Sequence, residues 1–488
     1  MSAKPEPMPR VRFRQRGMLA AVAVGTVVAA SCNLPFGPAV AIERQSFETA
    51  YVRLPQPHLE VRAVWRVKNT GDRPVSAIEV RLPDAKTHAV SRLSAESDGS
   101  EVAAAPAAGR STVHIEFREP LAIKAQQEIA VSYALAGNSS SGGGIVVNEA
   151  GFVLPIGEWT PALLPPSSEG PFARTSDALK HWDLTFRVPA GFLVYASGRS
   201  RGKTKEADSV VFRFQMRRED KQAFAVGGEF QEEKISAERR EVILWTLKAL
   251  PQNLAERAAE AAGQTAQFYD GEFGALETLA GTTRIIECPT SQPCWPVPGA
   301  ALPGSEIYRP EFWSSGVRGI DRQLAISWLD FRVHPDWRQE PFPMSALADY
   351  AADLAAVSRA QSGARRQMVQ AILADWDGMA KAGKERRLLA VQNSDPEAMR
   401  HNAQLKSELF FFALEDAVGS ETLHRAIQHL LQTYAGQSWH AADLRSALEL
   451  ESGKDLGAVF RSWLTETGIP GEFRSRYASG AEASGSAR

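Results

Sequence analysis

The chain has 488 residues, with 55 Lys and Arg against 57 Asp and Glu, and a formal net charge of −2. This length suffices for about two to four domains, and 44% hydrophobic with 23% charged residues is the composition of a folded globular protein. These values exclude a disordered chain, a fibrous repeat and a polytopic membrane protein, and the near-neutral charge argues against a nucleic-acid binder.

Residues 1–41 are expected to form an export leader. Residues 1–16 hold five basic residues and one acidic residue, so the rest of the chain carries −6. The uncharged run from Met18 to Ala30 is shorter than the roughly 20 residues of a membrane span, and this layout is typical of a secretory signal peptide. It ends in Ala29-Ala30-Ser31-Cys32, which resembles a bacterial lipobox with Cys32 as the lipidated residue. Cleavage after Ala41 and an uncleaved anchor are the alternatives, and each places the body of the protein outside the cytoplasm, secreted or attached to the membrane.

Residues 42–248 are predicted to form an antiparallel β-sandwich. Apolar and polar residues alternate in Leu59 to Val67, in Val113 to Phe117 and in Leu184 to Val188, with Gly, Pro, Asn and Asp between such runs. Alternation with a period of two is the pattern of strands that bury one face.

Residues 249–476 are predicted to be mainly helical, so the fold class is α+β. Apolar residues recur every three or four positions over 254–269, 346–358, 365–382, 404–418, 421–434 and 456–464. Thr467-Gly468-Ile469-Pro470 is expected to end the last helix. His424 and His429, five positions apart, are expected at the surface, and residues 477–488, rich in Ala, Gly and Ser, are expected to be disordered.

The chain has three cysteines, which agree with export. Cys32 would carry lipid, and Cys288 and Cys294 are predicted to form a disulfide around a small proline-containing loop. Five intervening residues are too many for a zinc knuckle. Trp295 follows this loop directly.

Three groups of segments carry a resemblance to a known family. They are Trp159-Thr160-Pro161 with the stretches 181–198 and 224–227; Trp328 with Val333 to Trp337 and Tyr350; and 414–419, 443–449, 452–456 and 460–470, which end in Trp463-Leu464 and Gly468-Ile469-Pro470. In order and spacing they resemble the membrane alanyl aminopeptidase family of gluzincin-clan zinc metallopeptidases. The resemblance implies an N-terminal β-sandwich followed by a mostly helical, thermolysin-like domain.

The family's zinc motif is degenerate in this chain. H-E-x-x-H on a helix places two His on one face to bind zinc and supplies a Glu as the base. Aligning Trp328 and Trp337 puts this motif at Arg322-Gln323-Leu324-Ala325-Ile326, and the third ligand, a Glu, at Ser345. A guanidinium cannot bind zinc, Ile326 has no donor atom, and Gln323 cannot act as a general base.

The family's remaining active-site residues are also replaced. Its substrate-binding Gly-Ala-Met-Glu-Asn strand corresponds to Gly299-Ala300-Ala301-Leu302-Pro303, which lacks the Glu that holds the substrate amine. Its transition-state Tyr corresponds to Gln404. Gly299, Ala300 and Ala301 are therefore interpreted as a vestigial substrate strand, with no catalytic residue and no metal ligand at the expected positions.

The sequence therefore predicts an exported, lipid-anchored, aminopeptidase-like protein without catalytic zinc or another cofactor. It would bind a peptide or an envelope protein, with the membrane reached through the N-terminus and no nucleic-acid partner. The alternative is an active zinc aminopeptidase that uses irregular ligands such as His334, Asp336 or Asp349.

Overall fold

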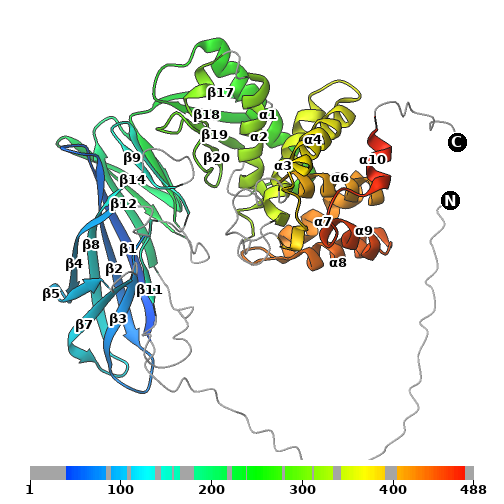
Figure 1. The fold of residues 1–488 in the computed structure, drawn as a ribbon. Coiled ribbons are helices and arrows are strands. Elements are labelled where there is room, and N and C mark those ends of the chain that lie inside the picture. Colours follow the sequence, from blue (N-terminus) through cyan, green and yellow to red (C-terminus); the bar gives the residue numbers. More distant parts are fainter. Residues whose placement is uncertain are drawn as a thin grey trace, which may run out of the picture.

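The computed structural model describes residues 40–83, 89–106, 112–137, 144–156, 159–164, 181–216, 223–237, 239–276, 281–309, 313–333, 342–390 and 404–478. Cys32, His334, Asp336 and the tail after Ala478 lie outside these ranges. A β-rich N-terminal region precedes a helical C-terminal region, so the predicted fold class is confirmed (Figure 1). No helix within the described ranges is long and apolar enough to cross a membrane.

The largest sheet, sheet A, has eight strands. Their order is β14 (Arg199–Glu206), β15 (Ser209–Gln215), β12 (His181–Pro189), β1 (Val40–Val52), β2 (His58–Asn69), β8 (Gln126–Ala136), β4 (Ala89–Ser97) and β5 (Ser100–Val102). Its pairs are antiparallel except β1 with β12, which run parallel, a departure from the all-antiparallel expectation. In β2, Leu59, Val61 and Trp65 are buried while Glu60 and Arg66 are exposed, as alternation predicts.

Two four-stranded sheets share the inner face of sheet A. Their apolar residues and those of sheet A form one core cluster. Sheet B has the order β11 (Ala162–Leu164), β3 (Val75–Arg81), β7 (Thr112–Leu121) and β6 (Ala104–Pro106); sheet C has the order β13 (Leu193–Ala196), β16 (Ala225–Gly228), β10 (Gly151–Leu154) and β9 (Val146–Asn148).

Sheet D connects the two regions. Its strands are β17 (Gln231–Ala237), β18 (Arg240–Thr246), β19 (Thr282–Ile286) and β20 (Ala300–Ala301), with β18, β19 and β20 parallel. The buried residues Val153, Val226, Ile243 and Trp245 belong to a core cluster shared by sheets C and D. The β-rich region and the helical region are therefore joined through an apolar interface.

The helices follow sheet D and form a core of their own with it. They are α1 (Gln252–Phe273), α2 (Trp313–Leu329), α3 (Phe342–Ser358), α4 (Ala364–Lys381), α6 (Ser407–Val418), α7 (Ser420–Thr433), α8 (Ala441–Ser452), α9 (Gly457–Leu464) and α10 (Gly471–Tyr477). Helix α10 corrects the expectation that the helices end before Pro470: Pro470 is the residue before the first turn of α10, a place where proline is tolerated. Its Phe473 packs edge to face on Trp463 of α9, with ring centroids 5.2 Å apart.

Candidate functional site

Helix α2 carries the five residues that align with the zinc motif. Ile326 is 1% exposed and belongs to the helical core. Arg322 lies on a face directed at α3, where its Nε donates a hydrogen bond to Oδ1 of Asp349. This pair is largely buried, with side-chain exposures of 24% for Arg322 and 7% for Asp349.

These residues do not fit a zinc ion. Zinc requires lone pairs from several ligands, whereas the Arg322 position presents a permanent cation and the Ile326 position a hydrocarbon. In Asp349, one of the irregular ligands of the alternative interpretation, Oδ1 accepts a hydrogen bond from the Arg322 guanidinium, and Oδ2 is buried without a hydrogen-bond partner among the described residues. Within the described ranges no three His, Cys, Asp or Glu side chains are grouped so as to hold a metal ion.

Gln323 is bound to the vestigial substrate strand. It is 8% exposed, and its Oε1 accepts a hydrogen bond from the backbone N–H of Leu302. Its Nε2 points at the carbonyl oxygens of Cys294, at 3.3 Å, and Leu302, at 3.4 Å. The side-chain amide therefore pairs with the backbone of Leu302 in the way a peptide group would.

The vestigial strand is also covered by the chain that precedes it. Val297 and Ala300 exchange two backbone hydrogen bonds around a turn in which Gly299 has a φ of 81°, a conformation that favours glycine. The N–H of Cys294 donates to the Leu302 carbonyl at 2.9 Å. Residues 294–297 thus return along Ala300 to Leu302 and use backbone groups that an added peptide strand would need.

A disulfide joins Cys288 and Cys294 and closes the loop between β19 and β20. Both cysteines are buried, which supports the pairing expected from the sequence. The same loop is bonded to its surroundings from three elements: Asn148 Nδ2 donates to Pro289 O at 2.6 Å, Tyr195 Oη to Pro298 O at 2.7 Å, and Ser327 Oγ to Val297 O at 3.1 Å. Trp295, in contrast, is 36% exposed.

A second ionic group, with buried carboxyls and a partly exposed Arg318, lies one turn closer to the N-terminus of α2 and one turn closer to the C-terminus of α3. Arg318 bonds Asp353 and also Glu408 of α6, and the two carboxyls are 1% and 4% exposed. Burial, followed by a hydrogen bond with Asp353, raises the pKa of Glu408 well above its ordinary value.

Asp330, at the end of α2, is also buried, and neither of its carboxyl oxygens has a hydrogen-bond partner. Burial raises its pKa well above the ordinary value. The cost of desolvating a carboxylate therefore favours the protonated forms of Glu408 and Asp330.

The ion pairs Arg322–Asp349 and Arg318–Asp353 were not predicted from the sequence, although the spacing of these residues indicates them. Arg318 and Arg322 are four positions apart on α2, and Asp349 and Asp353 are four apart on α3. Residues at this spacing share one face of a helix. Opposite charges at equal spacing in two helices predict two ion pairs only once the helices are known to be neighbours.

The other predicted positions do not join this group. Ser345 lies in the first turn of α3, and its side chain is not described. Gln404 lies in a π-helical turn over 404–406 and, with Leu405, lines a hollow of about 590 Å³ beside Asp375 and Met379 of α4. His424, expected at the surface, is buried and contacts Glu272 and Tyr350.

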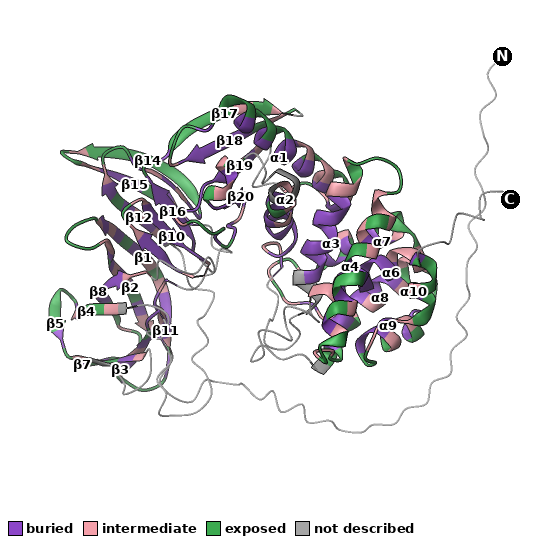
Figure 2. Ribbon diagram, turned by 45° about the horizontal axis from the view of Figure 1, so that its top comes forward, coloured by how far each residue is buried: buried purple, intermediate pink, exposed green. Residues whose placement is uncertain are grey.

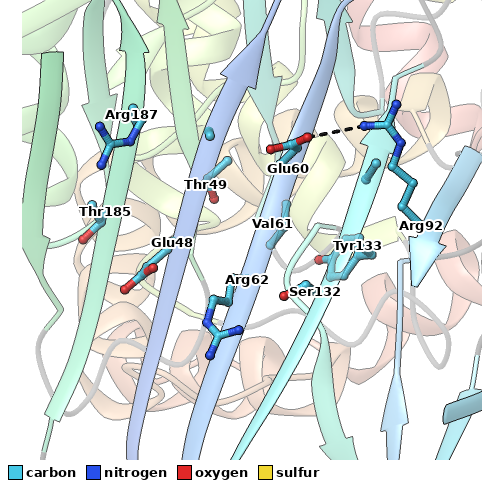
Figure 3. Close-up of a pocket in the computed structure, with 12 residues that line it drawn as sticks. Glu48, Thr49, Glu60, Val61, Arg62, Arg92, Ser132, Tyr133, Thr185 and Arg187 are labelled. Atoms are coloured by element: carbon cyan, nitrogen blue, oxygen red, sulfur yellow. Dashed lines mark hydrogen bonds and ion pairs between the residues drawn. The ribbon is translucent and has the colours of Figure 1, made fainter. Parts of the chain in front are cut away.

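A further hollow, of about 370 Å³, lies on the outer face of sheet A (Figure 3). The outward side chains of β8 are small there, including Ser132 and Ala134. This lets pairs from β2 and β4 meet across β8: Arg62 bonds Glu96 through two 2.9 Å contacts, and Arg92 reaches Glu60 at 3.4 Å. The small side chains of Ser132 and Ala134 leave room for these two ion pairs, which accounts for the hollow.

Comparison with known sequences matches a short part of the chain. No protein-family profile matches the chain. A 57-residue segment is 35% identical to the Tricorn protease-interacting factor F2 of Thermoplasma volcanium, a match that spans 12% of this chain and 7% of that protein.

Solved structures are similar over almost the whole chain. The M1 zinc metallopeptidase of Deinococcus radiodurans superposes with a TM-score of 0.61 at 18% identity, covering 88% of this chain and 95% of that one. A mutant of that enzyme bound to a Tyr-Ser-Ala substrate gives the same TM-score and coverage at 17% identity. The shared feature is thus the two-domain M1 metallopeptidase fold, which by itself leaves the chemistry open.

Proposed function

We propose that this protein is a degenerate relative of the M1 aminopeptidases, without catalytic zinc, that acts as a binding or scaffolding protein of the cell envelope. The proposal rests on the contacts of two residues, Arg322 and Gln323, that align with the zinc motif. Arg322 forms an ion pair with Asp349, and Gln323 forms hydrogen bonds with Leu302 and Cys294.

Both contacts oppose the family chemistry. Zinc-dependent hydrolysis needs a metal-bound water and a base that takes its proton. A guanidinium at a ligand position repels a dication, and a buried amide that already accepts and donates hydrogen bonds takes no proton. The fold is retained, and Arg322 and Gln323 make contacts within it that stabilise it.

The cellular location is part of the proposal. A leader ending at Cys32, followed by a body whose remaining cysteines form a disulfide, is consistent with an oxidising compartment outside the cytoplasm. A lipid on Cys32 would hold the folded domains at the membrane surface. Mass spectrometry of the N-terminus of the mature protein tests this: an acylated Cys32 supports the anchor, and a free Ile42 contradicts it.

Metal content tests the functional half. Purified protein, analysed by inductively coupled plasma mass spectrometry, is expected to hold only substoichiometric zinc and to leave an aminoacyl reporter uncleaved, with the Deinococcus radiodurans M1 enzyme as the positive control. Stoichiometric zinc with reporter cleavage that a chelator abolishes would overturn the proposal. In that case His334→Ala and Asp336→Ala variants would identify the irregular ligands.

A further inference from the structure

Strand β14 forms one edge of sheet A and is almost wholly exposed (Figure 2). In the described part of the chain it pairs only with β15. The side of β14 that faces away from β15 therefore presents backbone N–H and C=O groups that can pair with another extended chain.

This edge is strongly basic. β14 holds Arg199, Arg201, Lys203 and Lys205 and one acidic residue, Glu206, whereas the chain after residue 16 carries −6. Glu206 is already paired with Arg187 of β12, which lies on the other side of β15. Arg201 donates to the neutral Gln215, and Lys203 lies 5.9 Å from the centroid of the Phe212 ring. None of the ion pairs found among the described residues joins a basic side chain of β14 to a carboxylate.

The strand register places these charges on both faces of the sheet. Lys203 and Lys205 are opposite Phe212 and Val210, which face the core, whereas Arg199 is opposite Gln215 on the outer face. A strand added beside β14 would meet cations on either face. Positive charges at an edge also prevent pairing with the same edge of a second copy, so the charge that blocks self-pairing favours an acidic strand.

From the free edge and its unneutralised charge, we infer that β14 is a docking site for an acidic, extended peptide segment of a partner protein. Main-chain hydrogen bonds would add the segment as a ninth strand, and Lys203, Lys205 and Arg199 would select carboxylates. No large exposed apolar residue of the described chain lies on β14, which argues for a polar partner. The inference supplies a partner class for the binding role proposed above and so rests on it, but it uses residues remote from helix α2.

The test uses full-length protein and labelled synthetic peptides in fluorescence anisotropy. The peptide (Glu-Thr)₄ is expected to bind, and more weakly as salt rises. (Lys-Thr)₄ is expected not to bind. (Glu-Thr)₄ with every backbone nitrogen methylated has the same charge but no backbone N–H, and it is expected to bind at least several-fold more weakly because it cannot donate to a ladder.

Variants locate the site. The double variant Lys203→Glu/Lys205→Glu is expected to weaken (Glu-Thr)₄ binding by about tenfold, from the size of exposed charge interactions. The matched control, Lys124→Glu/Lys381→Glu, changes the net charge equally on other exposed surfaces and is expected to bind as the unaltered protein does. Circular dichroism checks that both variants fold.

Four outcomes would overturn the inference. The first two are no binding of (Glu-Thr)₄, and equal binding of its N-methylated form, which would show that charge alone suffices. The third is binding of anionic phosphatidylglycerol vesicles with no peptide binding, which would indicate a membrane. The fourth is concentration-dependent self-association in sedimentation that the double variant abolishes, which would indicate a second copy. Zinc is measured in the same preparations. A failure at β14 with little zinc leaves the proposed function standing, and stoichiometric zinc overturns that function independently.

Discussion

Gln323, which aligns with the general base of the zinc motif, cross-links helix α2 to the backbone of Cys294 and Leu302. A Glu at this position of a zinc enzyme faces the water it activates, whereas the Gln323 amide faces backbone groups of Cys294 and Leu302. An amide can both accept and donate, and a carboxylate can only accept. An amide at position 323 can therefore bond both the N–H and the carbonyl of Leu302, whereas a carboxylate could bond only the N–H.

The first prediction concerns this cross-link. Gln323→Ala is expected to lower the free energy of unfolding in urea by about 1–3 kcal/mol, because it leaves the buried N–H of Leu302 without a partner. Gln323→Glu is expected to be destabilising as well, since its carboxylate would face the carbonyls of Cys294 and Leu302. Gln252→Ala, at an exposed position of α1, is the control. Equal stability of Gln323→Ala and the control would contradict this role.

The second prediction concerns the buried carboxyl of Glu408. Its pKa is raised in the folded state, so the folded protein holds this proton more tightly than the unfolded chain does. The stability that follows is fully present below the unfolded pKa, near 4.3, and is lost as pH rises through the folded pKa. Glu408→Gln, which keeps a donor for Asp353 and an acceptor for Arg318, removes this loss.

The difference in unfolding free energy should therefore move in favour of Glu408→Gln between pH 5 and pH 8, by on the order of 1 kcal/mol or more. Urea unfolding at both pH values measures it. Glu421→Gln, whose parent side chain is 87% exposed and pairs with Arg425, should show no such change. A pH-independent difference for Glu408→Gln would show that Glu408 is ionised throughout.

At the scale of elements, the loop between β19 and β20 does more than connect two strands. It holds the disulfide and accepts hydrogen bonds from Asn148 and Tyr195 of the β-rich region and from Ser327 of α2. It also supplies the residues that cover the vestigial strand. Because a loop bonded on three sides has little freedom, the cover over that strand is expected to be rigid.

The third prediction tests the disulfide in this role. Closing so short a loop restricts the unfolded chain, and the loop-closure relation gives about 2 kcal/mol for it. The Cys288→Ser/Cys294→Ser double variant is therefore expected to unfold at a lower temperature and to exchange the amide hydrogens of Ala300 to Leu302 faster. The amides of β18 provide the internal control. Unchanged exchange at 300–302 would show that the hydrogen bonds alone fix the loop.

In the whole molecule, the position of strand β1 bears on where the leader is cleaved, because β1 begins at Val40. Val40 and Ala41 are 4% and 3% exposed and pair with Asn69 and Lys68 of β2. Cleavage after Ala41 would remove two buried residues from the middle of the eight-stranded sheet. This cost favours Cys32 as the processing site in our proposal.

The fourth prediction follows from this position. A chain starting at Ile42 is expected to be less stable than one starting at Val40, by about 2 kcal/mol for the lost burial of a valine and its neighbour. Thermal and urea unfolding of the two matched chains measure the difference. Equal stability would remove the structural objection to cleavage after Ala41.

Local patterns in the sequence predicted the fold class and the helices α1, α3, α4, α6, α7 and α9, but the spacing of apolar residues did not predict α2 or α8. Alternation in β2 and three-to-four spacing in α3 report which side of an element is apolar, and that depends only on near neighbours in the chain. The same signal failed where context decides. Helix α10 is short and follows Pro470, and β1 with β12 pairs in parallel through residues about 137 positions apart, as in Arg44 with His181.

The sequence by itself also determined which aligned positions lack zinc chemistry, because a guanidinium and a hydrocarbon are poor ligands in any fold. What these residues do instead was decided only by the tertiary structure. The Arg322–Asp349 pair, the Gln323 cross-link and the free basic edge of β14 each depend on which elements become neighbours. Hydrogen bonds and ion pairs act over a few ångströms between residues distant in the chain, so packing of the sheets and helices alone brings those atoms within reach.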